Sequence, residues 1–306
     1  MPWTAQDIED QAGRTFVVTG ANSGIGLQAA LELARHGAHV VLACRSLERG
    51  REAERRIAEA APGASTELRE LDLADLDSVR AFADGLDHEA IDVLVNNAGV
   101  MALPRRQTAQ GHELQLGTNH LGHFALTGLL LDRVRDRVVT VSSNAHRMGR
   151  VNFDDLHGRR RYFRWAAYGQ AKLANLLFAL ELQRRLAAAG SDVRSVAAHP
   201  GYAATNLQYQ ANNITGLPVD RLINGLMNLT VAQSDAMGAL PTLYAATEDV
   251  PGGAYVGPDG PGGWRGHPQV QAPSGRAQDA EDARRLWDVS EELTGVRFDL
   301  APAAPA

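Results

Sequence analysis

Short apolar runs alternate with longer helical patterns along most of the chain. The apolar runs predict strands at 16–18, 38–44, 66–71, 91–95, 137–143 and 193–198. Helical patterns lie between and after them, first through Ala34 and then over 47–60, 76–86, 110–136, 168–189 and 235–247. Strands that alternate with helices predict βαβ units with right-handed crossovers. We therefore expect an α/β fold, a doubly wound parallel sheet with helices on both faces.

The chain shows neither an internal repeat nor a clear linker, so we expect one domain over 1–306. Residues 1–13 are interpreted as a loosely attached lead-in. The Gly/Pro-rich run at 251–268 could connect two domains. A short strand at 254–256, a loop and a helix over 279–293 fit it better, so we assign 251–306 to the same domain.

A glycine-rich turn joins the first strand to the first helix. Its spacing is Gly20-x-x-x-Gly24-x-Gly26, which differs from the G-x-G-x-x-G of the standard dinucleotide fingerprint. Glycine lets the backbone bend and lets an anion approach closely, and a helix start supplies free N–H groups. The turn is therefore a candidate phosphate site. The alternative is a loop that merely connects strand and helix.

Glycines, amides and hydroxyls also follow the other predicted strands. They are Cys44-Arg45, Asp72, Asn97-Ala98-Gly99, Ser143 and His199-Pro200-Gly201. Ligands of parallel α/β sheets bind beyond the carboxyl ends of the strands. The sequence therefore predicts one ligand site along this edge.

Composition narrows the class of protein. The chain has 306 residues, 44% of them hydrophobic, and a net charge of −6, which argues against general binding to nucleic acid or acidic membranes. The one cysteine, Cys44, excludes an internal disulfide framework. The start lacks the basic and apolar regions of a secretory signal, and no segment approaches the roughly 18 apolar residues of a membrane span. We expect a soluble cytoplasmic protein.

Five motifs occur in a fixed order and together resemble the short-chain dehydrogenase/reductase family. They are the stretches 19–26, 96–99, Ser143, 168–172 and 200–201, within a resemblance that covers roughly 13–250. The stretches 43–46, 167–175 and 286–290 resemble its retinol-dehydrogenase-like branch, with light-dependent protochlorophyllide reductase as a more distant relative. The resemblance implies a Rossmann fold and an oxidoreductase that uses a pyridine dinucleotide.

Tyr168 and Lys172 are four residues apart on one predicted helix and so share a face. A free tyrosine has a pKa of about 10. A nearby ammonium should lower that pKa by about 1–3 units, toward the range of a general acid/base. The alternative is a Tyr/Lys pair on an ordinary solvated helix face.

The resemblance assigns the other catalytic roles. It implies that Ser143, the second serine of its pair, orients and polarises the substrate oxygen. It implies that Asn119 kinks its helix and holds a water beside Lys172, which also binds the nicotinamide ribose. Asn119 could instead be an ordinary polar helix position. The long interval 144–167 before Tyr168 predicts part of a substrate wall.

The end of the second strand bears on cofactor choice. An NAD enzyme usually carries an acidic residue there, whereas this sequence has Cys44 followed by Arg45 and Ser46. Arginine suits a 2′-phosphate, so NADP(H) is favoured and NAD(H) remains possible. Arg45 could also simply cap the strand edge.

The remaining cofactor contacts follow from the resemblance. The turn contributes Gly20, Asn22, Ser23, Gly24, Ile25 and Gly26. Asp72 and Leu73 should contact the adenine, although Asp72 could instead cap a helix. Asn97, Ala98 and Gly99 should approach the adenosine ribose. Pro200, Gly201 and Thr205 should lie along the nicotinamide.

Other conspicuous residues are interpreted as structural. Nine histidines lack the spacing of metal ligands, so we predict no catalytic metal; they are His36, His39, His112, His120, His123, His146, His157, His199 and His267. The basic run 159–164 is interpreted as a solvated loop. Residues 203–234 are interpreted as a substrate lid, and the apolar stretch 217–237 fits such a lid and ordinary helix burial equally well.

The sequence therefore predicts an NADP(H)-dependent oxidoreductase that interconverts a carbonyl and an alcohol on a fairly apolar small molecule. Hydride would pass to or from the nicotinamide while Tyr168 exchanges the proton. The alternatives are a cofactor-binding regulatory or scaffold protein without turnover, and an epimerase that uses bound nicotinamide transiently. A homodimer is plausible on base rates.

Overall fold

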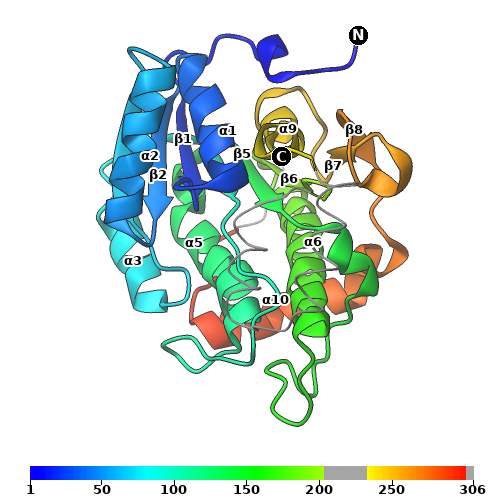
Figure 1. The fold of residues 1–306 in the computed structure, drawn as a ribbon. Helices are drawn as coiled ribbons and strands as arrows, with labels where there is room; N and C mark the ends of the chain where they lie inside the picture. The colour runs from blue at the N-terminus through cyan, green and yellow to red at the C-terminus, as the bar shows by residue number, and fades with distance from the viewer. Residues whose placement is uncertain (203–232, 301–306) are drawn as a thin grey trace, which may run out of the picture.

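A single sheet carries all the strands of the computed structural model, which describes residues 1–202 and 233–300 (Figure 1). The strand order is β3-β2-β1-β4-β5-β6-β7-β8. The strands are β1 (Thr15–Thr19), β2 (His39–Cys44), β3 (Ser65–Glu70), β4 (Ile91–Asn96), β5 (Val134–Val141), β6 (Arg194–Ala198), β7 (Tyr255–Pro258) and β8 (Pro268–Gln271). All pair in parallel except β8, which is antiparallel to β7. The order reverses between β1 and β4, which opens a crevice at their carboxyl ends.

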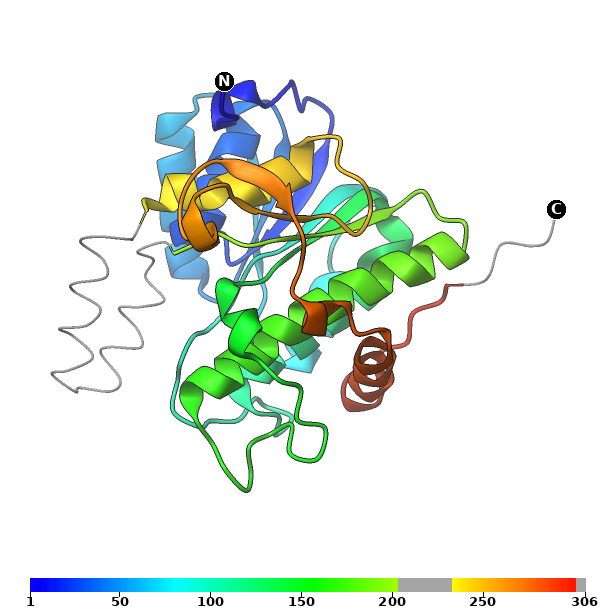
Figure 2. The same cartoon turned by 90° about the vertical axis from the view of Figure 1, so that its right-hand side faces the viewer.

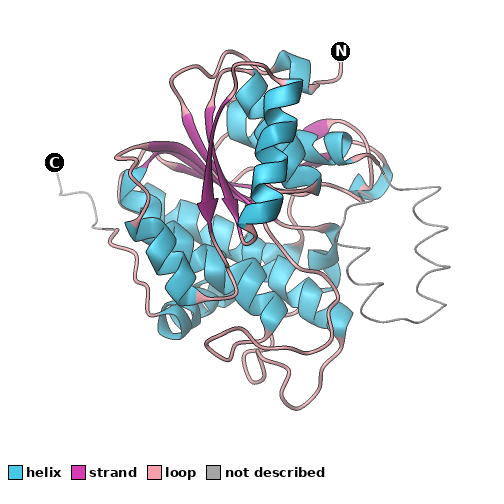
Figure 3. Ribbon diagram, turned by 60° about the vertical axis from the view of Figure 1, so that its left-hand side comes forward, coloured by secondary structure: helices cyan, strands magenta, loops and turns pink. Residues whose placement is uncertain are grey.

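Helices cover both faces of the sheet, as Figure 3 shows. One face packs against α1 (Gly24–Arg35), α2 (Leu47–Ala60) and α9 (Asp235–Thr247). The other packs against α3 (Leu76–Asp84), α5 (Gly122–Leu130) and α6 (Arg164–Ala188). Alternation along β1 sends Phe16 and Val18 into the first layer and Val17 into the second. The predicted doubly wound α/β fold is confirmed.

The C-terminal helix α10 (Ala280–Thr294) packs on the outside of α6 (Figure 2). Its Trp287 lies against Phe124 of α5, with ring centres 5.1 Å apart, and stacks on Phe178 of α6 at 5.8 Å. Burial of a large aromatic side chain is a major source of stability. This contact attaches the end of the chain to the same core.

The sheet extends further than the sequence predicted. The Gly/Pro-rich run contains β7 and leads into β8, which pair as an antiparallel hairpin rather than forming a linker. The sequence analysis missed β8 because four residues, Pro268–Gln271, are too short for a periodic signal. Backbone pairing with the edge of β7 creates this strand.

The first residues are attached more firmly than predicted. The Trp3 indole N–H donates a 3.0 Å hydrogen bond to Glu248, and its ring packs edge-on against Tyr244 of α9. His267 Nδ1 donates to the Trp3 carbonyl at 2.9 Å. The prediction of a loosely attached lead-in is therefore wrong. The contacts of Trp3 come from residues distant in sequence, so they left no local signal. Within the described residues, none of the helices has the length and apolar character to cross a bilayer.

Candidate active site

The glycine turn after β1 forms a tight cradle. Gly20 has a φ of +68°, and its N–H donates to the Ala43 carbonyl of β2 at 2.8 Å. A Cβ on Gly26 would lie 2.5 Å from the Gly20 carbonyl oxygen, so only glycine fits there. Helix α1 begins at Gly24, and the side chain of its N-cap residue, Ser23, forms no capping hydrogen bond within the described part of the chain. The first-turn N–H groups of α1 are thus available to an anion.

A cavity runs from this cradle along the carboxyl ends of the central strands. It brings together most of the residues predicted to bind the cofactor: Gly20, Asn22, Ser23, Gly24, Ile25, Gly26, Arg45, Ser46, Asp72, Leu73, Asn97, Ala98, Gly99, Tyr168, Lys172 and Pro200. The sequence analysis missed other lining residues: Ala43, Arg49, Leu71, Val100, Thr118, Val141 and Ser142. The predicted ligand edge is therefore one continuous cavity.

Three of the predicted site residues, Asn119, Ser143 and Gly201, are not among the residues that line this cavity. Gly201 has a φ of +68° and packs against the Trp264 carbonyl, which also accepts a 2.7 Å hydrogen bond from the Tyr202 N–H. Thr205 and nearly all of the predicted lid 203–234 lie outside the described residues. The described part of that segment is Gln233 and Ser234, and the Gln233 side-chain amide donates to the Pro200 carbonyl at 2.6 Å.

Tyr168 and Lys172 lie one turn apart on α6 and both line the cavity. Only 8% of Tyr168 and 4% of Lys172 are exposed. The Lys172 ammonium lies 6.0 Å from the centre of the Tyr168 ring and donates to the Val141 carbonyl at 2.9 Å. This burial excludes the alternative of a solvated helix face.

The predicted lowering of the Tyr168 pKa is wrong. Burial raises the pKa of Tyr168 to about 12, and a hydrogen bond with Ser143 opposes the rise only in part. Burial also lowers the pKa of Lys172 to about 8. A nearby ammonium favours the phenolate, but removing the phenol from water disfavours the charged form more strongly. The phenol therefore keeps its proton at neutral pH, as a proton donor must.

The two serines at the end of β5 have different partners. The Ser142 hydroxyl is buried and donates to the Lys172 carbonyl on α6 at 2.7 Å. The Ser143 hydroxyl accepts from the Ala145 N–H at 3.2 Å and bonds with Tyr168. Ser142 thus ties the strand to the helix, while Ser143 faces the phenol. The catalytic role of Ser143 stays a prediction.

Asn119 lies where its helix changes type. Residues Gly117–Leu121 form a π-helical segment between the short α4 (Leu114–Leu116) and α5, closed by the Gly122 N–H donating to the Gly117 carbonyl. Asn119 Oδ1 accepts from the Val100 N–H at 2.7 Å, and its Nδ2 donates to the Val100 carbonyl at 2.9 Å. The predicted distortion of this helix is confirmed. The amide holds the loop beside Gly99 in place and is no ordinary polar position.

His123 connects Asn119 with Thr19 at the end of β1. It was not among the site residues predicted from the sequence. Its Nδ1 lies 3.0 Å from the Asn119 carbonyl, which can only accept, so Nδ1 carries the proton. Burial lowers the pKa of His123 to about 4, so the ring is neutral and Nε2 accepts from the Thr19 hydroxyl at 2.9 Å. Thr19 Oγ1 in turn accepts from the N–H groups of Asn97 and Ala98 at 2.9 Å. One buried histidine therefore links β1, the loop after β4 and the π-helical segment.

The cavity is positively charged at the end of β2, where an anion could bind. Arg45 and Ser46 line the cavity with Arg49 from the first turn of α2, and Ser46 accepts a capping hydrogen bond from the Arg49 N–H. Burial raises the pKa of the Cys44 thiol to about 12, so this thiol is neutral. Arg49 could have been predicted as a cavity residue, because it lies in the first turn of the helix that follows the Ser46 cap.

Asp72 is not a helix cap. Its Oδ1 accepts from the Ala74 N–H at 2.9 Å, whereas Asp75 is the N-cap of α3 and accepts from the Asp77 N–H at 3.0 Å. Asp72 lines the cavity without capping α3, and its contact with the adenine stays a prediction.

The interval 144–167 packs against the loop that precedes α4. The Tyr162 hydroxyl lies 2.9 Å from the Leu103 carbonyl and 3.0 Å from a Glu113 oxygen. Trp165 meets Tyr168 edge to face, with ring centres 6.4 Å apart. The backbone N–H groups of Arg159 and Arg160 donate to Asp155, and both side chains are exposed, in agreement with a solvated loop. An aromatic ring thus lies beside the phenol, but a substrate wall stays a prediction.

Comparison with known proteins settles the family. The family model of the short chain dehydrogenases matches residues 14–214, which is more than half of the chain. The chain belongs to the short-chain dehydrogenase/reductase family. Within it, the chain is 41% identical to human retinol dehydrogenase 13 over 295 residues, covering 93% of this chain and 85% of that protein. It is 40% identical to human retinol dehydrogenase 12 over 293 residues, with 94% and 88% covered.

Solved structures of this family have the same fold. A protein of uncharacterised function from Mycobacterium paratuberculosis is 50% identical, with a TM-score of 0.83 and 98% of this chain and 100% of that chain covered. A proposed NAD(P)-dependent gluconate 5-dehydrogenase from Beutenbergia cavernae, with NADP bound at low occupancy, is 29% identical. Its TM-score is 0.59, with 78% and 91% covered. The retinol-dehydrogenase-like branch of the family is thus confirmed, while a homodimer and a cytoplasmic location stay predictions.

Proposed function

We propose that this short-chain dehydrogenase/reductase is an NADP(H)-dependent enzyme that interconverts a carbonyl and an alcohol on a fairly apolar small molecule. One observation carries the proposal. A single cavity joins a glycine cradle at a helix start to the buried pair Tyr168 and Lys172. A pure sensor of the cofactor would need the cradle but would not need a buried phenol with a serine beside it.

The residues present fit a pyridine dinucleotide. Gly20, Gly26 and Gly99 line the cavity, where the absence of a side chain lets a ligand approach the backbone closely. The uncapped start of α1 suits a diphosphate. When bound, the dinucleotide would supply or accept a hydride at its nicotinamide ring.

The chain supplies the proton and orients the substrate. Tyr168 holds its proton at neutral pH and would donate it to the carbonyl oxygen during reduction. Ser143 would donate a hydrogen bond to the same oxygen and so polarise the carbonyl. Lys172 would place its ammonium where a phenolate develops, and Asn119 would keep the adjoining loop in position.

A preference for NADP(H) rests on charge at the end of β2. Arg45 and Arg49 offer guanidinium groups that match a phosphate, and the neutral Cys44 thiol brings no repelling charge. The Beutenbergia cavernae structure, described as holding NADP, supports this preference by likeness.

The substrate class rests on Trp165 and on the relatives. An aromatic ring beside the phenol favours an apolar group next to the reacting carbonyl. The relatives named retinol dehydrogenases suggest retinaldehyde as the first probe.

The test follows NADPH absorbance with retinaldehyde and a panel of apolar aldehydes, ketones and quinones. We expect turnover with NADPH that Tyr168→Phe reduces by about 10²–10⁴-fold while NADPH still binds. Binding of NADPH without turnover of any carbonyl would favour a regulatory protein. Inversion of a substrate centre without net loss of NADPH would favour an epimerase.

A further inference from the structure

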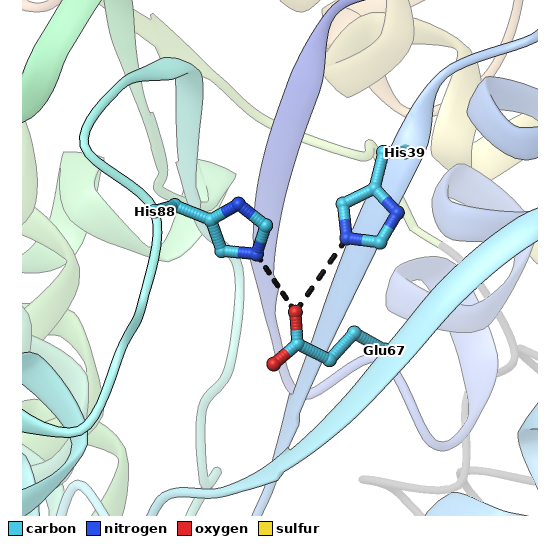
Figure 4. A group of neighbouring side chains, drawn as sticks. All are labelled: His39, Glu67 and His88. Carbon is cyan, nitrogen blue, oxygen red and sulfur yellow. Dashed lines mark hydrogen bonds and ion pairs between the residues drawn. The ribbon is translucent and has the colours of Figure 1, made fainter.

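Two histidines and a glutamate converge at the amino-terminal end of the outer strands (Figure 4). His39 begins β2, Glu67 lies in β3, and His88 follows α3. In the parallel register, Val41 pairs with Glu67 and His39 with Ser65, so His39 and Glu67 are two residues apart along one face. The cofactor cavity lies at the other end of these strands, beyond Cys44. The cluster therefore belongs to neither the cavity nor its chemistry.

The distances suit a small cation. One oxygen of Glu67, Oε2, lies 2.7 Å from His88 Nε2 and 3.5 Å from His39 Nε2. All three candidate ligand atoms lie within 4.8 Å of one another. Zinc bonds of about 2.0–2.1 Å in a tetrahedron place neighbouring ligand atoms about 3.3 Å apart. Side-chain shifts of about 1 Å, estimated from the same tetrahedron, would complete that arrangement.

The His39 ring is prepared for a metal on the side that faces Glu67. Its Nδ1 forms a 2.7 Å hydrogen bond with the Ser65 hydroxyl. Its Nε2 is shielded from solvent and has no hydrogen-bond partner among the described residues. Its polar neighbour is Glu67 Oε2 at 3.5 Å, which is too far for a good hydrogen bond. Metal-binding histidines are typically held in this way, with the second nitrogen fixed by a neighbouring polar group.

Glu67 is oriented in the same manner. Its other oxygen, Oε1, accepts from Arg69 Nε, and the Arg69 guanidinium also pairs with Asp87 at 3.3 Å. Burial opposes ionisation of Glu67, but the hydrogen bonds of His88 and Arg69 prevail and lower its pKa. Arg69 thus fixes the carboxylate and leaves Oε2 directed at the two histidines. Asp87 offsets the positive charge that Arg69 brings.

We propose that His39, Glu67 and His88 form a binding site for a divalent transition metal, Zn²⁺ by its donor set. Two imidazoles and one carboxylate with an open fourth position are typical of zinc. The side chains of His39, Glu67 and His88 are 29%, 24% and 25% exposed, so the cluster lies close to the protein surface. The metal would fasten the loop before β4 to β3, the edge strand of the sheet.

The test is titration of ZnCl₂ into tag-free protein that has been treated with EDTA, followed by calorimetry. We expect one zinc per chain and a rise in the melting temperature of the wild type on saturation. His88→Gln and Glu67→Gln should each weaken binding at least about tenfold, and Ser65→Ala about 10–100-fold. His36→Gln is the matched control, because His36 is a half-buried histidine close to β2 that lies outside the cluster.

Folding of each variant is checked by its circular dichroism and by its metal-free melting temperature. Replacement of zinc by Co²⁺ gives a second readout, since tetrahedral cobalt with nitrogen and oxygen ligands absorbs visible light intensely. Absence of zinc binding in the wild type would overturn the proposal. Equal zinc affinity in the wild type, His88→Gln and Glu67→Gln would overturn it as well. Neither result depends on turnover of NADPH.

Discussion

Replacing Lys172 by methionine should stabilise the cofactor-free protein at neutral pH. Lys172 is the only lysine of the chain, against 29 arginines. Its side chain is buried, and burial lowers its pKa from 10.5 to about 8. At 1.36 kcal/mol per pKa unit, keeping the ammonium charged inside the fold costs roughly 3 kcal/mol at about pH 7. Methionine has a similar length and removes this cost.

The hydrogen bond that is lost offsets part of the gain. Lys172 donates to the Val141 carbonyl, but Asn175 Nδ2 donates to the same oxygen at 3.0 Å. The carbonyl therefore stays satisfied, and the loss amounts to about 1 kcal/mol. We expect Lys172→Met to raise the free energy of unfolding by about 2 kcal/mol at neutral pH and to abolish turnover. An arginine at this position would stay charged, because its pKa cannot fall in this way.

The gain should depend on pH in a defined direction. Below about pH 8 Lys172 is protonated in both the folded and the unfolded wild type. The folded wild type then bears the full free-energy cost of burying the ammonium. Between about 8 and 10.5 the unfolded chain still binds a proton that the folded chain has released. The stability of the wild type relative to the variant therefore rises with pH across that window. The advantage of Lys172→Met should shrink by roughly 2–3 kcal/mol between pH 7 and pH 10.

Urea unfolding of the wild type and of Lys172→Met between about pH 7 and pH 10 gives the difference in their free energies of unfolding. The other titrating groups are the same in both proteins, so their contributions cancel. Lys172→Arg is the matched control and should show no gain at neutral pH, because the guanidinium stays charged. Labelling the protein with ¹³C-lysine gives one signal, whose titration reports the pKa of Lys172 directly. A difference in stability that does not change with pH, or a lysine signal that titrates near 10.5, would refute the reasoning.

Three further predictions concern the cavity. Arg45→Ala should raise the KM for NADPH by about 10–100-fold and leave that for NADH unchanged, since one charge-assisted hydrogen bond to a phosphate contributes about 1.5–3 kcal/mol; equal effects on both cofactors in steady-state kinetics would count against a 2′-phosphate site. His123→Leu should lower the free energy of unfolding by about 1–3 kcal/mol and also weaken NADPH binding, because the Thr19 hydroxyl and the Asn119 carbonyl lose their partner; unchanged NADPH affinity in calorimetry would separate His123 from the site. Trp165→Ala should raise the KM for apolar aldehydes more than it changes kcat; a selective fall in kcat would contradict a purely substrate-binding role.

Much of the fold was predictable because its signals are local. Helix α2 begins after the Ser46 cap and keeps one apolar face, so its bounds 47–60 agree with the sequence prediction. The glycine turn was recognisable because strand, turn and helix are adjacent in the sequence. The strand ends that gather at the cavity followed from parallel topology alone.

Other features depend on contacts between distant residues and left no local signal. The strand β8 exists because β7 offers an edge, and Trp3 is fixed by α9. Burial raises the pKa of Tyr168, and the extent of that burial depends on tertiary packing, which residue spacing does not reveal. His39, Glu67 and His88 lie on three separate elements, so no histidine spacing could indicate their convergence.

In the proposed reaction, one carbonyl receives its hydride from the nicotinamide and its proton from Tyr168. The most direct test supplies NADPH with deuterium on the transferable side of nicotinamide C4 and analyses the product alcohol by mass spectrometry. We expect one deuterium on the carbinol carbon for each NADPH oxidised, and a large loss of this transfer in Tyr168→Phe. Oxidation of the labelled NADPH with no deuterium in the product, or full transfer in Tyr168→Phe, would contradict it.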